Sequence, residues 1–236
     1  MAPPIEVVAL VLADKNGKDK SIKLIQYCGK LALWTLKKRQ IECPQFTRPC
    51  SAMVSNFSLF RNIMRLGDWL DACIATEELL AKVSSQKGKL DSKDVRKLIV
   101  AMADFWNTIN DDIYTTWKMG VHRSKGMASM AEIQASYGWI IAIVLNLLTE
   151  WEKYQELKVK MQLATSKVQE KQGHDQTIKG LHNSLHMSRL NMLKLTFDGL
   201  FCLIDVFQLD IDPIFQILTG MGSGIIGYYK VYQKMR

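Results

Sequence analysis

The sequence predicts an all-α integral membrane protein, with amphipathic surface helices in its N-terminal half and one or two transmembrane helices. Hydrophobic residues make up 48% of the 236 residues, with only 5 Pro and 14 Gly. Long stretches rich in Leu, Met, Lys and Ala favour helices. No Asn-Gly or Asp-Gly turn separates alternating apolar runs, apart from Asn16-Gly17, which lies in a run of charges. Two uncharged windows also come close to the length of a membrane span.

Gly, Pro and charged segments divide the chain into its expected helices. The first helix ends at about Ala13 and is followed by a charged loop from Asp14 to Lys20. The later helices are expected over Asp19–Arg39, Ser51–Val83 with a bend at Gly67, Asp91 or Ser92 to Met119, Ser129–Gln169, Gln176–Leu209, and Pro213 to the C-terminus. We therefore expect a basic amphipathic region over residues 1–126 and a membrane-anchoring region over residues 127–236.

The two uncharged windows are Ile133–Thr149 and Pro213–Tyr229. Each reaches the lower limit of about 17 residues for a transmembrane helix. Trp139 and Trp151 could anchor the first window at the membrane interface. Because both windows are short and mean hydropathy is only −0.03, buried helices of a soluble bundle are the alternative.

The charge distribution predicts where the two ends of the chain lie. The net charge of +8 is concentrated in the ends, since residues 1–132 and 213–236 are positive while residues 133–212 carry a net charge of −1. Two spans would place both positive ends on one side, as the positive-inside tendency predicts. The basic balance also suits a surface of anionic phospholipid.

Glycines cluster in the C-terminal window at positions 220, 222, 224 and 227. Gly220 and Gly224 fall on one helix face, where they would let another helix approach closely. Local flexibility is the alternative reading of these glycines.

The segment Asp19–Arg39 predicts a basic amphipathic helix. Its lysines Lys20, Lys23, Lys30 and Lys37 are expected to contact lipid headgroups. The alternative is a solvated face of a helical bundle.

The segment Ser51–Val83 has a wide apolar face bordered by Arg61 and Arg65, which are expected to bind headgroups. Its expected membrane-inserting residues are Phe57, Leu59, Phe60, Ile63, Met64, Leu66 and Leu70. Insertion of such a face expands one leaflet and favours curvature, whereas packing against the core is the alternative.

These residues carry a resemblance to the peroxin-11 family. The run Arg65-Leu66-Gly67 with Leu70 is similar to the family's amphipathic segment, Lys23–Leu31 to its second helix, and Gly220–Tyr232 to its C-terminal hydrophobic segment. The resemblance covers most of the chain through loose patterns, and glycosomal membrane proteins of the same superfamily fit equally well.

The resemblance implies a protein of the peroxisomal or glycosomal membrane with both termini facing the cytosol. Such proteins elongate the organelle membrane before fission, self-associate as homo-oligomers, and recruit organelle fission machinery. The resemblance also implies recognition by the import receptor for peroxisomal membrane proteins, and a role in metabolite passage. Asp68 and Asp71 depart from the family pattern, since they dilute the positive face of the amphipathic segment.

Catalytic signatures are missing from the sequence, which contains no HExxH, P-loop, GxSxG or GxGxxG motif. His174, His182 and His186 have no carboxylate or Cys at ligand spacing, so no metal site is predicted. We expect no enzyme activity, no cofactor and no nucleic-acid partner. A pore-forming channel subunit and a soluble helical adaptor are the alternatives to membrane remodelling.

Overall fold

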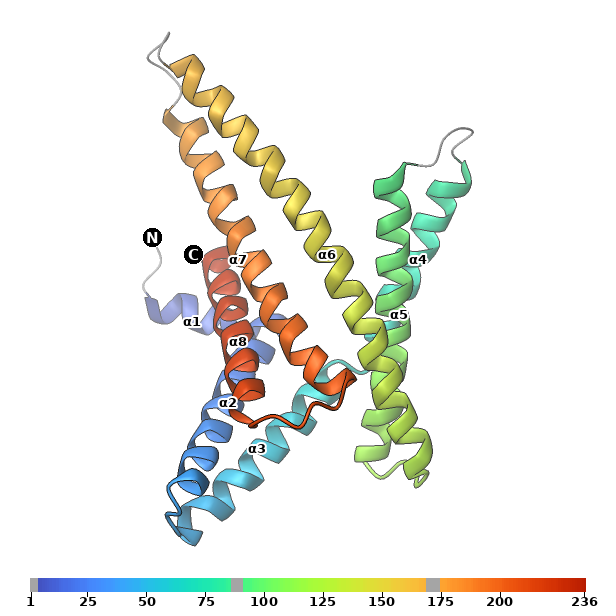
Figure 1. Cartoon of the computed structure of the whole chain (residues 1–236), viewed down its shortest axis with the longest axis vertical. Coiled ribbons are helices and arrows are strands. Elements are labelled where there is room, and N and C mark those ends of the chain that lie inside the picture. Colours follow the sequence, from blue (N-terminus) through green and yellow to red (C-terminus); the bar gives the residue numbers. More distant parts are fainter. Residues whose placement is uncertain (1–3, 86–90, 169–174) are drawn as a thin grey trace.

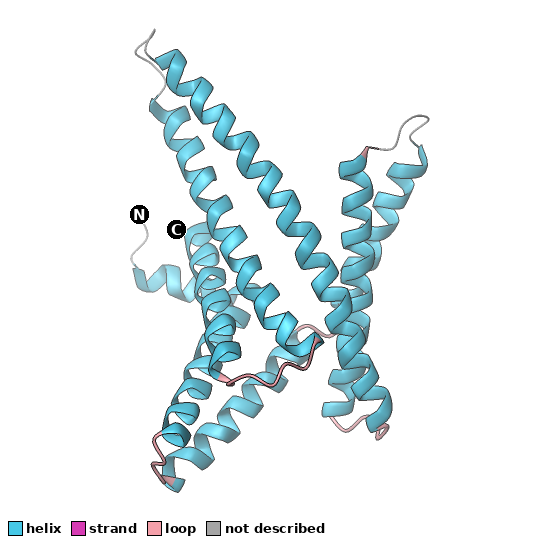
Figure 2. Ribbon diagram, in the orientation of Figure 1, coloured by secondary structure: helices cyan, strands magenta, loops and turns pink. Residues whose placement is uncertain are grey.

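A computed structural model describes residues 4–85, 91–168 and 175–236, and these residues form helices joined by short loops (Figure 2). Within this part of the chain there is no strand, which confirms the all-α prediction. The helices are α1 (Pro4–Ala13), α2 (Lys15–Lys38), α3 (Pro44–Met64), α4 (Asp68–Ser85), α5 (Ser92–Lys118), α6 (Lys125–Val168), α7 (Asp175–Val206) and α8 (Ile214–Met235).

The predicted loop from Asp14 to Lys20 is wrong, because α2 begins at Lys15. The Asp14 carboxylate caps this helix by accepting a hydrogen bond from the Gly17 backbone N–H at 2.9 Å. Gly17 also lets α1 approach closely, since a Cβ atom there would lie 2.0 Å from the Val11 carbonyl oxygen. The charges of this segment therefore lie on a helix that turns sharply away from α1.

The single helix expected over Ser51–Val83 is divided in two at Gly67. Gly67 has a φ of +87°, a conformation that glycine adopts without strain and other residues rarely adopt. Its backbone N–H donates to the Asp112 carboxylate at 2.8 Å, which ties the break to α5. The first half also begins earlier than predicted, at Pro44, because proline suits the first turn of a helix.

Six of the helices form a closed ring (Figure 1). Around this ring α2 packs on α3, α3 on α5, α5 on α6, α6 on α7, α7 on α8, and α8 on α2. Helix α4 packs on α5 from outside the ring, and α1 packs on α2 and α8. The boundary predicted at residues 126/127 falls at the start of α6, and helices from both sides of it pack together.

One helix of the described chain, over Lys125–Thr165, is long and apolar enough to cross a membrane. It contains the predicted window Ile133–Thr149. The second window lies in α8, which does not meet the same criterion of length and composition. Both helices nevertheless expose apolar side chains on their outer faces: Tyr137, Ile141, Val144 and Leu148 on α6, and Phe215, Leu218, Ile225 and Tyr229 on α8.

Candidate functional site

A cavity of about 650 Å³ lies inside the ring. All six ring helices contribute side chains to its lining. Its charged lining residues are Asp19, Lys20, Lys23, Lys30, Arg61, Arg65, Asp111, Glu132, Lys194, Asp198 and Asp205. A cavity with so many charges, enclosed by a ring in which α6 and α8 have apolar outer faces, is the most distinctive feature of the molecule.

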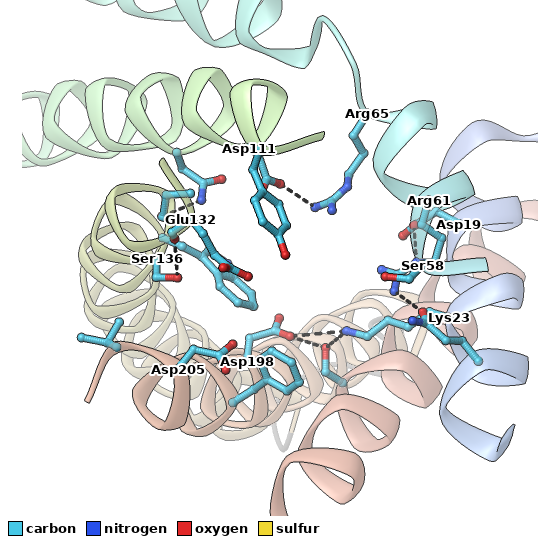
Figure 3. Close-up of a pocket in the computed structure, with 18 of the residues that line it drawn as sticks. Asp19, Lys23, Ser58, Arg61, Arg65, Asp111, Glu132, Ser136, Asp198 and Asp205 are labelled. Carbon is cyan, nitrogen blue, oxygen red and sulfur yellow. Dashed lines mark hydrogen bonds and ion pairs between the residues drawn. The ribbon is translucent and has the colours of Figure 1, made fainter. Parts of the chain in front are cut away.

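The charges are separated onto two walls (Figure 3). The wall formed by α2 and α3, together with Arg65, carries five basic residues and one acidic residue, Asp19. The opposite wall, formed by α5, α6 and α7, carries four acidic residues and one basic residue, Lys194. Two ion pairs cross between the walls: Lys23 Nζ lies 3.7 Å from Asp198 Oδ1, and an Arg65 nitrogen lies 3.4 Å from Asp111 Oδ2.

Asp19 is the centre of the cluster on the basic wall. It accepts a hydrogen bond from Arg61 Nε at 2.8 Å and one from Lys20 Nζ at 2.7 Å, while Arg61 also donates to the Gln26 side chain at 3.0 Å. Burial alone would raise the pKa of Asp19, but the charges of Arg61 and Lys20 outweigh it and hold this pKa at about 2. The cluster therefore stays ionised and fixes α3 against α2.

A second cluster joins α2, α7 and α8 around Asp198. Lys194 donates to Asp198 at 2.7 Å, and the Ser223 hydroxyl donates to the same carboxylate. Lys23 donates to Ser223 at 3.1 Å. Burial lowers the pKa of Lys23 to about 8, although the Asp198 charge opposes this shift. Lys23 is thus a buried cation that depends on its partner across the cavity.

Aromatic side chains lie beside the acidic wall. Phe201 is 6.1 Å from Trp139 and 6.3 Å from Tyr27 between ring centroids, and Tyr114 also lines the cavity. Lys30 Nζ lies 4.9 Å from the centre of the Tyr27 ring, within the range of a cation–π contact. The acidic wall can therefore offer both carboxylates and ring faces to a cation.

The structure divides the predicted headgroup-binding residues into two groups. Lys37 is exposed on α2 and does not line the cavity. The others line it: Lys20, Lys23, Lys30, Arg61 and Arg65. The sequence pattern correctly groups most of these cations on one side of α2 and α3, but it does not reveal the carboxylates that they face.

The predicted membrane-inserting residues are also divided. Phe60 is 44% exposed, Ile63 is 38% exposed and Leu70 is 52% exposed. The remaining members are only partly exposed: Phe57, Leu59, Met64 and Leu66. One apolar edge of α3 and α4 is consequently exposed, and the rest packs against neighbouring helices.

Gly220 and Gly224 lie where α8 crosses α2. A Cβ atom at Gly220 would be 2.3 Å from the Tyr27 ring, and one at Gly224 would be 3.2 Å from Leu24 Cδ2. Gly227, one turn further along α8, faces Lys20 in the same way. This row of glycines lets α8 approach the lysine-bearing helix closely enough for Ser223 to reach the charged cluster.

The acidic wall is the part of the site that the sequence reasoning missed. The sequence did contain a pattern that could have revealed this wall on α7. Charged and aromatic residues there recur at a spacing of four, three and four positions, which places them on one helix face: Lys194, Asp198, Phe201 and Asp205. Within the described residues, no group of three or more His, Cys, Asp or Glu side chains could hold a metal ion, and His174 lies outside them.

Comparison with known proteins identifies the family. The peroxisomal biogenesis factor 11 (PEX11) family matches residues 6–232 of the chain. No curated protein and no solved structure matches the chain. The match covers both charged walls, the long apolar helix and the glycine row. The chain belongs to the PEX11 family, and its general role is therefore in the biogenesis and proliferation of peroxisomes.

Proposed function

We propose that this protein elongates and curves the peroxisomal membrane by inserting the outer edge of α3 and α4 into one leaflet. The observation that carries the proposal is the exposure of Phe60, Ile63 and Leu70 on a surface that no other described helix covers. Large exposed apolar side chains that lie together mark a membrane or partner contact. Membership of a peroxisome biogenesis family favours the membrane.

The orientation of α3 supports insertion. Arg61 is held against Asp19 on the inner side of the helix, so this side cannot turn toward lipid without breaking a 2.8 Å ion pair. Phe60 and Ile63 point away from Arg61 because residues one and two positions apart on a helix occupy different faces. After the turn at Gly67, α4 continues the exposed edge with Leu70 and Ile74.

The structure changes which cations would bind headgroups. Lys37 is exposed outside the cavity, and Arg65 is 43% exposed although it also pairs with Asp111. The charged ends of Lys20, Lys23 and Arg61 are more deeply placed and are engaged in ion pairs or hydrogen bonds inside the ring. Headgroup binding in this proposal therefore rests on Lys37 and Arg65. Each cation near an anionic surface contributes about 1 kcal/mol to membrane binding.

The experiment is reconstitution of the full chain with anionic vesicles, followed by electron microscopy of vesicle shape. Wild type should produce tubules, and Phe60→Glu and Ile63→Glu should each abolish them, because a carboxylate cannot enter the acyl region at low cost. Ser55→Glu is the matched control, since it adds the same charge at an exposed polar position of α3. Tubulation by both glutamate variants at the wild-type level would overturn the proposal.

The proposal also includes the remaining family expectations. The protein would lie in the peroxisomal membrane with both termini in the cytosol, associate with itself, contact organelle fission machinery and be recognised by the import receptor for peroxisomal membrane proteins. Proximity labelling from the full chain on peroxisomes should recover fission and import components, and Phe60→Glu should leave this recovery intact while blocking elongation. If neither fission components nor import components are labelled, this part of the proposal is wrong.

The charged cavity favours a second candidate function, the passage of small solutes. A polar interior beside two helices with apolar outer faces, α6 and α8, is the arrangement expected of a membrane pathway. Planar-bilayer recording on the purified full chain tests this function. Conductance that changes its ion selectivity in Glu132→Gln would support it, and no conductance at high protein load would exclude it.

A further inference from the structure

The geometry points to a binding site inside the ring for a zwitterion that carries a phosphate at one end and a substituted ammonium group at the other, as phosphocholine does. The inference uses the same cavity as the second candidate function but does not require passage through it. It is also independent of membrane bending by α3 and α4. Three properties of the cavity support it: its size, the separation of its charges and the position of its aromatic rings.

The volume of about 650 Å³ lies within the range of small-molecule sites, which is roughly 300–1,000 Å³. Its lining is formed by the whole ring of helices and therefore does not depend on a single loop or helix end. A zwitterion would contact both walls at once, whereas a simple anion or cation would contact only one.

The basic wall is suited to the phosphate. Arg61 is fixed in place by Asp19 and Gln26, so its remaining donors are pre-positioned at the cavity surface. Ser58 lies on the same wall and can donate a hydroxyl hydrogen bond (Figure 3). Lys30 also lines the cavity; it contacts the Tyr27 ring and forms no ion pair within the described part of the chain, so no carboxylate neutralises its charge.

The acidic wall is suited to the ammonium group. Glu132 and Asp205 line the cavity and form no ion pair among the described residues. Glu132 accepts a hydrogen bond from the Tyr114 hydroxyl, and Asp205 accepts one from the Gln216 side chain, so both carboxylates are held in place without a cation to neutralise them. Trp139 and Phe201 lie beside them, 6.1 Å apart between ring centroids. Carboxylates combined with aromatic rings attract quaternary ammonium groups by charge and by cation–π interaction.

Charge separation distinguishes this reading from a purely structural role for the cluster. Charges that serve only to hold helices together are expected to be neutralised by their partners. Here two ion pairs cross between the walls, at Lys23–Asp198 and Arg65–Asp111, and Lys30, Glu132 and Asp205 stay without an ionic partner in the described chain. A dipolar ligand would neutralise both unpaired sets at the same time.

The test is calorimetric titration of the purified full chain, in a detergent without a choline headgroup, with phosphocholine, inorganic phosphate or tetramethylammonium. Phosphocholine should bind at least about tenfold more tightly than either single-ended probe, since each end adds a charge-assisted contact. Equal binding of phosphocholine and phosphate, or no binding of phosphocholine, would overturn the inference.

Two variants test which wall binds the phosphate and which wall binds the ammonium group. Lys30→Gln should weaken both phosphocholine and phosphate about tenfold, whereas Glu132→Gln should weaken phosphocholine about tenfold and leave phosphate unchanged. Loss of folding could not produce this selective pattern. Lys18→Gln and Glu77→Gln are matched controls, because both residues are exposed and outside the cavity lining. Wild-type affinity in both cavity variants would also overturn the inference.

The same titration in nanodiscs separates the two possible sources of the ligand. If phosphatidylcholine nanodiscs suppress phosphocholine binding and phosphatidylglycerol nanodiscs do not, the site takes the headgroup of a membrane lipid. If phosphocholine binds equally in both, the site takes a soluble zwitterion. Either result is consistent with the binding site, and neither depends on whether the protein conducts solutes or bends vesicles.

Discussion

The two uncharged windows of this protein have the same length, and yet they pack in different ways. In α6, Gly138 meets the backbone of α5, because a Cβ atom there would lie 2.8 Å from the Ala103 carbonyl oxygen. The inner face of α6 continues this contact with a row of small residues: Ala128, Ala131, Ala135 and Ala142. Helix α6 therefore packs closely on α5 and leaves its apolar outer face exposed.

In α8 the small residues meet side chains. Gly220, Gly224 and Gly227 lie against Tyr27, Leu24 and Lys20 of α2, and Ser223 between them bonds to Asp198. The inner face of α8 is thus part of a charged site, while its outer face remains apolar. The two windows thus share an uncharged, apolar outer face, and they differ on the inner face, where the neighbouring helix determines which residues it contacts.

The largest expected effect concerns membrane topology, because a terminal tag is either accessible to protease or fully protected. If both windows cross the membrane, the two termini lie on one side, and added protease should remove tags from both ends of the chain in intact peroxisomes. The apolar outer face of α8 and the positive charge of both ends favour this result. Protection of one tag alone would show that α6 crosses and α8 does not.

Replacement of Gly138 with Ala should destabilise the protein by about 3 kcal/mol, since the added methyl group meets backbone that cannot move aside. Chemical unfolding in detergent, followed by circular dichroism, measures this loss. Gly199→Ala is the matched control, because its Cβ atom would make an ordinary 3.4 Å contact with Ile143. Equal stability of the two variants would contradict the close α5–α6 contact.

Removal of the Asp19 charge tests how much the ion pair between Asp19 and Arg61 stabilises α2, the helix against which α8 packs. Asp19→Asn should cost about 2 kcal/mol, because it leaves Arg61 partly buried beside a neutral group. The pKa of Asp19 falls from 3.8 to about 2 on folding, so its contribution is present above pH 3.8 and is lost as the pH falls toward 2. Unfolding curves across this acid range should show a steeper loss for wild type than for the variant.

The glycine row of α8 predicts the smallest effects. Gly220→Ala should destabilise by about 1–2 kcal/mol, because the Tyr27 ring must shift to make room. Gly224→Ala should stay within about 0.5 kcal/mol of wild type, since Leu24 Cδ2 can yield and alanine favours the helix. Thermal unfolding of both variants in one detergent decides the order, and a larger loss for Gly224→Ala would reverse the packing described for α8.

Much of the fold was predictable from local sequence. The all-α class, the helix from Ser92 and the helix that begins at Ile214 follow from caps, prolines and apolar periodicity. The early start of α2 was not predictable, because it depends on Gly17 meeting Val11. The division at Gly67 was predicted only as a bend, since its positive φ and its bond to Asp112 depend on α5.

The cavity was the hardest part to predict. Periodicity shows which residues share a helix face, but it does not show what that face meets. Lysines on α2 and arginines on α3 therefore suggested a lipid surface. In the structure Lys23 instead faces Asp198 and Ser223, which lie 175 and 200 residues away in the sequence. Such pairings depend on the order of helices around the ring.

The contact between α2 and α8 also constrains how the chain can fold. Lys23 and Ser223 are 200 positions apart, and their hydrogen bond forms only after the last helix has been synthesised. Until then, the lysines of α2 lack the Asp198–Ser223 pair and the glycine row that covers them. Contacts so distant in sequence form late in folding. The ring therefore closes only after α8 has been synthesised, and an intermediate without α8 would expose charges of α2 that α8 covers in the folded protein.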